Sequence, residues 1–191
     1  TQSLSSAASD VYKRQLGRYV DCRGTGSDLD TGIIMAVSTN KDLFANFVDE
    51  LRTSFPQIAG AVSTGMGLPG GEVVADVPYW RVRLLASETD GIQVLDAFVK
   101  AAQKRNEYPI LIIDEANLAF SPDVSKNKPM LDKLVQLTKQ QREMMTLLTS
   151  SEHAYPYKLN RIGFNQADLK NVIHAGEIPP KEMRELLVSR L

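Results

Sequence analysis

The chain has 191 residues, of which 43% are hydrophobic and 24% charged, a composition typical of a soluble globular domain. Its net charge of -1 disfavours a nucleic-acid or anionic-membrane partner, because such binding depends on a surplus of cations. A single cysteine, Cys22, excludes a disulfide framework and a cysteine-based zinc cluster, and it favours a reducing, cytoplasmic compartment. The longest apolar run, residues 33–37, is far shorter than the roughly 20 residues of a membrane-spanning helix.

The N-terminal segment, residues 1–15, is polar and has no periodic apolar face, so we predict a tail that adds nothing to the fold. Within it, residues 5–15 resemble the conceptual translation of a transposase-type sequencing adapter; the alternative is a natural polar terminus. If the adapter interpretation holds, native sequence begins near Leu16. Because the chain also ends within a helical pattern at Leu191, we expect it to be an internal piece of a longer protein.

A strand and a helix are predicted over the first part of the native sequence. Residues 18–22 indicate a short strand, and a glycine-containing loop follows over residues 23–30. Thr39 and Asp42 form a possible capping box for a helix that Pro56 ends. The apolar residues at helical spacing in this helix are Leu43, Phe44, Phe47, Val48 and Leu51.

A long loop and a second helix come next. Residues 60–78 are rich in glycine and valine and predict an irregular insertion. Tyr79 and Trp80 stand among arginines, a mixture that can bind nucleic acid, but we favour a loop or strand that packs on the core. Asp90, with Gln93 three residues later, predicts the start of a helix. Its apolar face is expected to comprise Ile92, Leu95, Phe98, Val99 and Ala102.

Strands and helices continue to alternate to the end of the chain. The uninterrupted apolar run at residues 109–113 is typical of a strand buried on both faces. A helix beginning at Pro129, a strand over residues 145–149, a strand over residues 171–175 and a helix from Pro179 are predicted after it. This alternation favours a three-layer α/β fold around a parallel sheet.

Two adjacent acids, Asp114 and Glu115, follow the apolar run directly. Ligands of parallel α/β sheets bind at the carboxyl ends of the strands, and a pair of carboxylates there requires a compensating cation. In nucleoside triphosphatases the cation is Mg²⁺, held by the first acid while the second orients and deprotonates the attacking water. The alternative is a helix N-terminus, where acidic residues are favoured without any chemistry.

Three hydroxyl residues, Thr149, Ser150 and Ser151, end the next predicted strand. A neighbouring strand end can place a polar side chain against a terminal phosphate or the attacking water. Hydroxyl residues also end many strands that have no such role. The three hydroxyls therefore support a nucleotide site only in combination with Asp114 and Glu115.

The order of these parts resembles the ATPases of the additional-strand P-loop class, closest to the archaeal-type ATPases grouped with AAA+ and STAND proteins. The resemblance covers residues 18–191, but its specific segments are residues 110–115, 147–151 and 176–187. It implies binding and hydrolysis of ATP with Mg²⁺ by the parent protein, driving a conformational switch or remodelling. It also implies a metal-associated acid, a catalytic base and a sensor group: Asp114, Glu115, and one of Thr149, Ser150 or Ser151.

The chain departs from this family at its most specific motif. No Gly-x-x-x-x-Gly-Lys-Ser/Thr sequence is present, and the glycine-rich residues 65–71 have no Lys-Ser or Lys-Thr after them. We therefore expect an incomplete domain whose P-loop lay upstream of Leu16. The predicted divisions are a non-native tail (1–15), a partial P-loop core (16–178) and the start of a helical lid (179–191).

Other residues have weaker functional interpretations. Arg142, Arg161 and Arg184 could stabilise phosphoryl charge, although solvated surface arginines are the simpler interpretation. His153 is expected on a surface loop, and Cys22 is expected to be a small core residue.

Two alternative functions stay open. One is a non-catalytic interaction or regulatory domain that keeps the sheet without turnover. The other is a helicase-type ATPase, because residues 114–117 resemble an Asp-Glu-Ala-Asp box with Ser150 in a following motif. The expected partners are a nucleotide, and either a second copy of the chain or a protein client.

Overall fold

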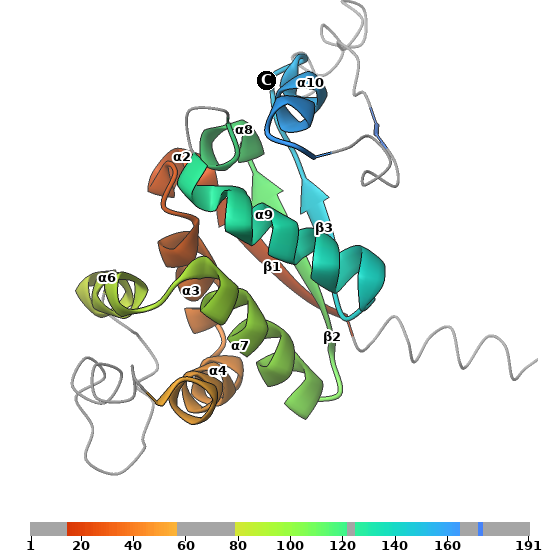
Figure 1. Ribbon diagram of the computed structural model, residues 1–191. Coiled ribbons are helices and arrows are strands. Elements are labelled where there is room, and N and C mark those ends of the chain that lie inside the picture. Colours follow the sequence, from red (N-terminus) through yellow and green to blue (C-terminus); the bar gives the residue numbers. More distant parts are fainter. Residues whose placement is uncertain (1–14, 57–78, 122–124, 165–171, 174–191) are drawn as a thin grey trace, which may run out of the picture.

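The computed structural model describes residues 15–56, 79–121, 125–164 and 172–173, and it shows an α/β unit built on a small parallel sheet (Figure 1). The strands are β1 (Gln15–Asp21), β2 (Tyr108–Asp114) and β3 (Met145–Leu148), in the order β1-β2-β3 with every pair parallel. The apolar run after Pro109 therefore forms the central strand. The predicted strands at residues 18–22 and 145–149 are confirmed to within a few residues.

The described helices are α2 (Cys22–Thr25), α3 (Leu29–Ser38), α4 (Lys41–Ser54), α6 (Tyr79–Glu88), α7 (Gly91–Lys104), α8 (Ala116–Ala119), α9 (Lys128–Val135) and α10 (Tyr155–Arg161). The longer helices cover one side of the sheet, whereas α2, α8 and α10 lie near the end toward which the strand arrows point (Figure 1). Helix α3 packs against β1 and α7 packs against β2, while α4 and α9 pack against α7. A 3-10 turn precedes α9 at Ser125–Asn127, and a π-helical turn, Gln136–Gln140, follows it.

Local sequence signals explain where the two longest helices begin. Helix α7 starts where predicted, with a capping box in which the side chains of Asp90 and Gln93 each accept a hydrogen bond from the other's backbone N–H. Helix α4 is capped by Asn40, whose side chain accepts from the Leu43 N–H at 2.9 Å. Thr39, the predicted cap, instead donates its hydroxyl proton to the Ala36 carbonyl.

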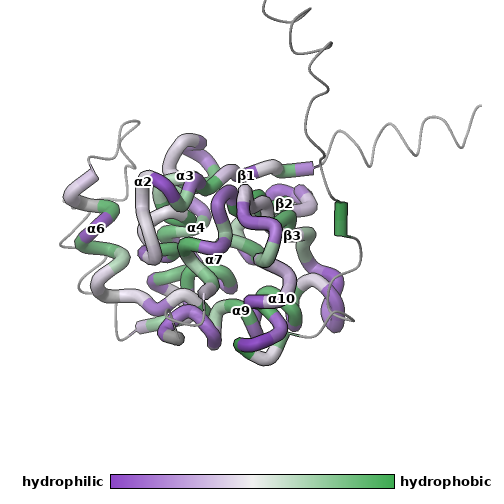
Figure 2. Tube along the Cα trace, turned by 90° about the horizontal axis from the view of Figure 1, so that it is seen from above, coloured by the Kyte–Doolittle hydropathy of each residue, from purple (hydrophilic) through white to green (hydrophobic). Residues whose placement is uncertain are grey.

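One face of the sheet forms the core with these helices. Side chains alternate along each strand, and Leu16, Val20, Leu111 and Ile113 all point to the covered face, where each is buried. Helix α3 approaches β1 closely because Gly32 has no side chain: a Cβ there would lie 2.6 Å from Cγ1 of Val20. In Figure 2 the hydrophobic stretches of α4 and α7 lie in the middle of the molecule, and α6 lies at its margin.

The opposite face is open in the described part of the chain, so the predicted third layer is not seen there. Tyr19, Met145 and Leu147 project from this face and are 54%, 53% and 49% exposed. Ile110 and Ile112 of β2 are half-buried between them. The prediction that β2 is buried on both faces is therefore wrong for the described residues. We call the surface of these five residues the open face.

Several other expectations need correction. The loop predicted over residues 23–30 ends earlier than expected, because helix α3 begins at Leu29. Residues 79–88 form helix α6 and not the expected loop or strand. Gln15, assigned to the tail, is the first residue of β1. Ile92, predicted in the buried face of α7, is 38% exposed.

Some predicted segments lie outside the described residues, namely 1–14, 60–78 and the last helix from Pro179. Of the strand predicted at residues 171–175, only Val172 and Ile173 are described; both are exposed and neither belongs to a strand. Among the helices that are described, none has the length and apolar character needed to cross a bilayer.

Candidate functional site

The predicted acids and hydroxyls meet at the carboxyl edge of the sheet, the end toward which the strand arrows point in Figure 1. Asp21 of β1 is the register partner of Asp114 of β2. Beyond the end of β3, the Thr149 N–H donates to the Ile113 carbonyl and the Ala116 N–H donates to the Thr149 carbonyl, both at 2.9 Å. These two backbone bonds hold the hydroxyl segment beside the acidic pair.

The carboxylate of Asp114 accepts hydrogen bonds from three side chains, and the backbone N–H of Glu115 bonds to it as well. Its Oδ1 accepts from the Thr149 hydroxyl. Its Oδ2 accepts from the Tyr19 hydroxyl at 2.6 Å and from Nη2 of Arg23 at 2.9 Å. The Thr149 and Tyr19 bonds, with the positive charge of Arg23, hold the pKa of Asp114 below its usual range. Asp114 is thus ionised and immobilised near neutral pH.

Arg23 links two of the acids. Its Nε donates to Oδ1 of Asp21 at 3.1 Å, while its Nη2 reaches Asp114. The backbone N–H of Arg23 also donates to Asp21, which caps the short helix α2. The roles of Tyr19 and Arg23 were not predicted from the sequence. The available signal was their position: Tyr19 shares a strand face with Asp21, and Arg23 follows β1 at the same sheet edge.

Glu115 adopts a left-handed backbone conformation, with φ 51° and ψ 44°. This conformation costs a residue with a side chain about 1–2 kcal/mol. Glu115 stands at the N-terminus of α8, but its side chain makes no capping hydrogen bond. Its Oε2 instead accepts from the Ser151 hydroxyl at 3.0 Å. The alternative interpretation was that acidic residues are favoured at a helix N-terminus. The Glu115 carboxylate does not cap α8, however, and contacts Ser151 instead.

Ser150 contacts a third side chain of the same segment. Its hydroxyl donates to Oδ1 of Asn117 at 2.8 Å and accepts from the Glu152 N–H at 3.0 Å. Each hydroxyl residue therefore contacts a different member of residues 114–117. The helicase interpretation depends on the same two segments, residues 114–117 and Ser150. The contact between Asn117 and Ser150 is therefore compatible with both the P-loop ATPase of the AAA+ and STAND type and the helicase-type ATPase.

The side chains of the weaker candidates make none of these hydrogen bonds. Cys22 is fully buried, as expected for a core residue, and burial raises the pKa of its thiol to about 11. Cys22 is also close enough to Asp21, Asp114 and Glu115 for their negative charges to help raise this pKa. His153, Arg142 and Arg161 are exposed. Arg184 lies outside the described residues. Tyr79 and Trp80 are exposed on α6, at the margin of the molecule in Figure 2.

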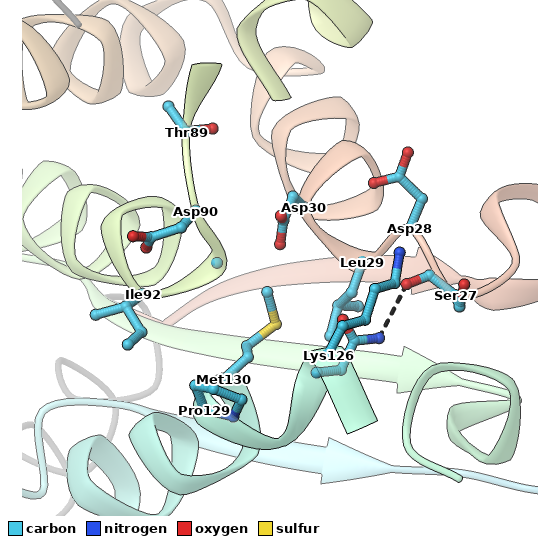
Figure 3. Close-up of a pocket in the computed structure, with 12 residues that line it drawn as sticks. Ser27, Asp28, Leu29, Asp30, Thr89, Asp90, Ile92, Lys126, Pro129 and Met130 are labelled. Atoms are coloured by element: carbon cyan, nitrogen blue, oxygen red, sulfur yellow. Dashed lines mark hydrogen bonds between the residues drawn. The ribbon is translucent and has the colours of Figure 1, made fainter. Parts of the chain in front are cut away.

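A separate cavity of about 370 Å³ lies where α3, α7 and α9 begin (Figure 3). It is lined by the acids Asp28, Asp30 and Asp90, by Lys126, and by apolar residues that include Met130. Asp30 points into it from α3 (Figure 3). Burial, reinforced by the negative charge of Asp28, raises the pKa of Asp30 to about 6. No local sequence pattern reveals this cavity, because its residues come from three distant segments.

The acidic edge offers ligands for a cation that keeps most of its water. Within the described residues, no group of three or more His, Cys, Asp or Glu side chains could enclose a metal ion. Mg²⁺ shared with phosphates needs only one or two carboxylates, and Asp114, with a side chain 23% exposed, meets this lesser requirement.

Comparisons with known proteins identify no relative. A scan against protein-family models, a search of curated proteins and a search of solved structures each find no match for this chain.

Proposed function

We propose that the chain is part of an ATPase domain in which Asp114 associates with Mg²⁺ and Glu115 is the catalytic base. One observation carries the proposal: the two acids at the end of the central strand each accept a hydrogen bond from a hydroxyl at the end of the neighbouring strand. Asp114 is held by Thr149 and Glu115 by Ser151. A purely structural acidic pair does not require partners from the next strand.

The side chains have distinct tasks in this proposal. When bound, Mg²⁺ would neutralise phosphate charge and orient the terminal phosphate. Asp114, ionised and fixed by Thr149, would hold the water shell of the cation. Glu115, presented by its left-handed backbone and oriented by Ser151, would accept a proton from the attacking water. Thr149 would be the sensor residue, because it alone of the three hydroxyls touches Asp114.

The sheet supports the same proposal. In the resembled fold, the strand that leads into the P-loop lies beside the sensor strand, which corresponds to β3. The described residues leave the outer edge of β3 and the open face without a covering element. A P-loop strand and the helix after it would pair with that edge and bury that face.

The test uses the protein extended upstream to include a P-loop. Glu115→Gln keeps the size and polarity of the side chain but removes the base, so ATP binding should persist while turnover falls by about 10²–10⁴-fold. Asp114→Asn should instead shift the Mg²⁺ dependence of turnover to higher concentration, because the amide lacks the charge that holds the metal's water shell. Binding and hydrolysis are measured for both variants against magnesium concentration.

Glu107→Gln is the matched control, because Glu107 precedes the opposite end of β2 and pairs with Arg105. It should leave turnover unchanged. If Glu115→Gln hydrolyses ATP at the parent rate, the catalytic assignment is wrong and the acidic pair is structural.

A second candidate function, a non-catalytic interaction domain, is favoured by the open face alone. Tyr19, Met145 and Leu147 form an apolar surface that a second copy or a protein client could cover. Turnover by the extended protein distinguishes this candidate from the ATPase.

A further inference from the structure

The side chain of Arg23 lies where a cation associated with Asp114 would have to act. The carboxylate has about four lone-pair positions. The side chains of Thr149, Tyr19 and Arg23 use three of them, and the backbone N–H of Glu115 also bonds to the carboxylate. Two of the three side-chain bonds end on Oδ2. A cation, or a water molecule that it carries, must therefore displace one of these donors.

Arg23 is also the residue that balances charge at this edge. Asp21 and Asp114 are register partners on adjacent strands, so their carboxylates would repel each other without a cation between them. The guanidinium bridges them, with Nε on Asp21 and Nη2 on Asp114. A divalent cation at Asp114 would take over the same electrostatic role.

The bridge can open at little cost. The side chain of Arg23 is 60% exposed, and exposed ion pairs typically add little to stability. Arg23 also lies on α2, a helix of only four residues at the end of β1, and few neighbouring atoms pack against its exposed side chain. It can leave Asp114 without disturbing the core.

We propose that Arg23 is an internal counter-ion of Asp114, which occupies the carboxylate in the cation-free protein and competes with a divalent cation for it. Tyr19 assists by filling a second position on Oδ2. The inference rests on the proposed function only in assigning a cation to Asp114. In this proposal Arg23 does not bind the cation itself but sets the cation concentration at which Asp114 becomes occupied.

The test is a titration of this chain with Mn²⁺, followed by electron paramagnetic resonance, which counts free and bound ion without nucleotide or turnover. Arg23→Gln removes the competing charge and its hydrogen bond, so we expect the dissociation constant for Mn²⁺ to fall by up to about fivefold, in line with the modest strength of an exposed pair. Tyr19→Phe frees one lone pair and leaves the charge, so we expect a smaller decrease, of about twofold.

Two controls separate competition at Asp114 from a general charge effect. Arg105→Gln removes a positive charge near the opposite end of the sheet, where Arg105 pairs with Glu107, and should leave Mn²⁺ affinity unchanged. In an Asp114→Asn background, Arg23→Gln should no longer tighten binding. Circular dichroism of every variant checks that the fold is retained.

Three results would overturn the inference: no tightening in Arg23→Gln, equal tightening in Arg105→Gln, or tightening that persists without the Asp114 carboxylate. Failure of the proposed function has a different signature. If Glu115→Gln leaves ATP turnover unchanged while Arg23→Gln tightens Mn²⁺ binding through Asp114, the catalytic assignment fails and the counter-ion inference stands.

Discussion

Asp30 couples the stability of the fold to pH. Its carboxylate lies in the cavity between the starts of three helices, and its pKa is raised to about 6 from a reference value of 3.8. The folded protein therefore binds this proton more tightly than the unfolded chain does. The resulting stability is fully present below about pH 4 and is lost as the pH rises through about 6.

We predict that Asp30→Asn removes this pH dependence, because the amide is neutral throughout. The variant should unfold with a free energy higher than the parent by about 1 kcal/mol at pH 7, the usual scale of one pKa shift after solvent screening. Urea unfolding between pH 4 and 7 measures it. Asp132→Asn, at an exposed acid paired with Lys128, is the control; equal pH profiles for Asp30→Asn and the parent protein would refute the prediction.

At the scale of the element, two neighbouring methionines distinguish the buried core from the open face of the sheet. Met144 is 1% exposed in the core, and Met145, the first residue of β3, is 53% exposed on the open face. We predict that Met144→Ala destabilises the protein by about 2–4 kcal/mol through the lost burial and the cavity left behind. Met145→Ala should change stability by less than about 0.5 kcal/mol.

Thermal unfolding of the two variants provides the comparison, and each serves as the control for the other. A cost for Met145→Ala as large as that for Met144→Ala would mean that the open face is covered in solution. In that case analytical ultracentrifugation shows whether a second copy provides the cover.

Elements with a clear one-sided pattern could be predicted from the sequence, and those without one could not. Helix α7 combines a capping box with an apolar stripe, and both were recognised. Helix α3 was missed because its buried residues, among them Leu29, Ile33 and Val37, occur on nearly all sides of a helix that contacts β1, α4, α6 and α7. A helix surrounded by the protein has no polar face to mark its period.

The candidate site likewise contains residues that local sequence could predict and residues that it could not. Asp114, Glu115 and Thr149 follow apolar runs, so local sequence placed them at one sheet edge. Tyr19 and Arg23 reach Asp114 across 95 and 91 residues of sequence. Only the pairing of β1 with β2 brings them there, and no local pattern encodes that contact.

At the scale of the whole molecule, the chain has the acids and hydroxyls of the proposed site but no sequence motif of the kind that cradles phosphates. The backbone amides and the lysine of a P-loop provide that cradle in the resembled family. We predict that this chain alone binds ATP with a dissociation constant no lower than about 1 mM, because it lacks those groups. Isothermal titration calorimetry with magnesium present measures it, with Asp114→Asn as the control.

Micromolar binding that Asp114→Asn weakens would contradict this prediction and would show that another part of this chain supplies the cradle.

The backbone at Glu115 also has an evolutionary consequence. Glycine adopts the left-handed conformation without steric cost, so replacing this glutamate relieves strain wherever its carboxylate is no longer needed. Under the proposed function, selection for turnover retains the glutamate at this codon, whereas selection for stability favours its replacement. In a lineage that abandons hydrolysis, position 115 is where the loss would be recorded early, as glycine or asparagine.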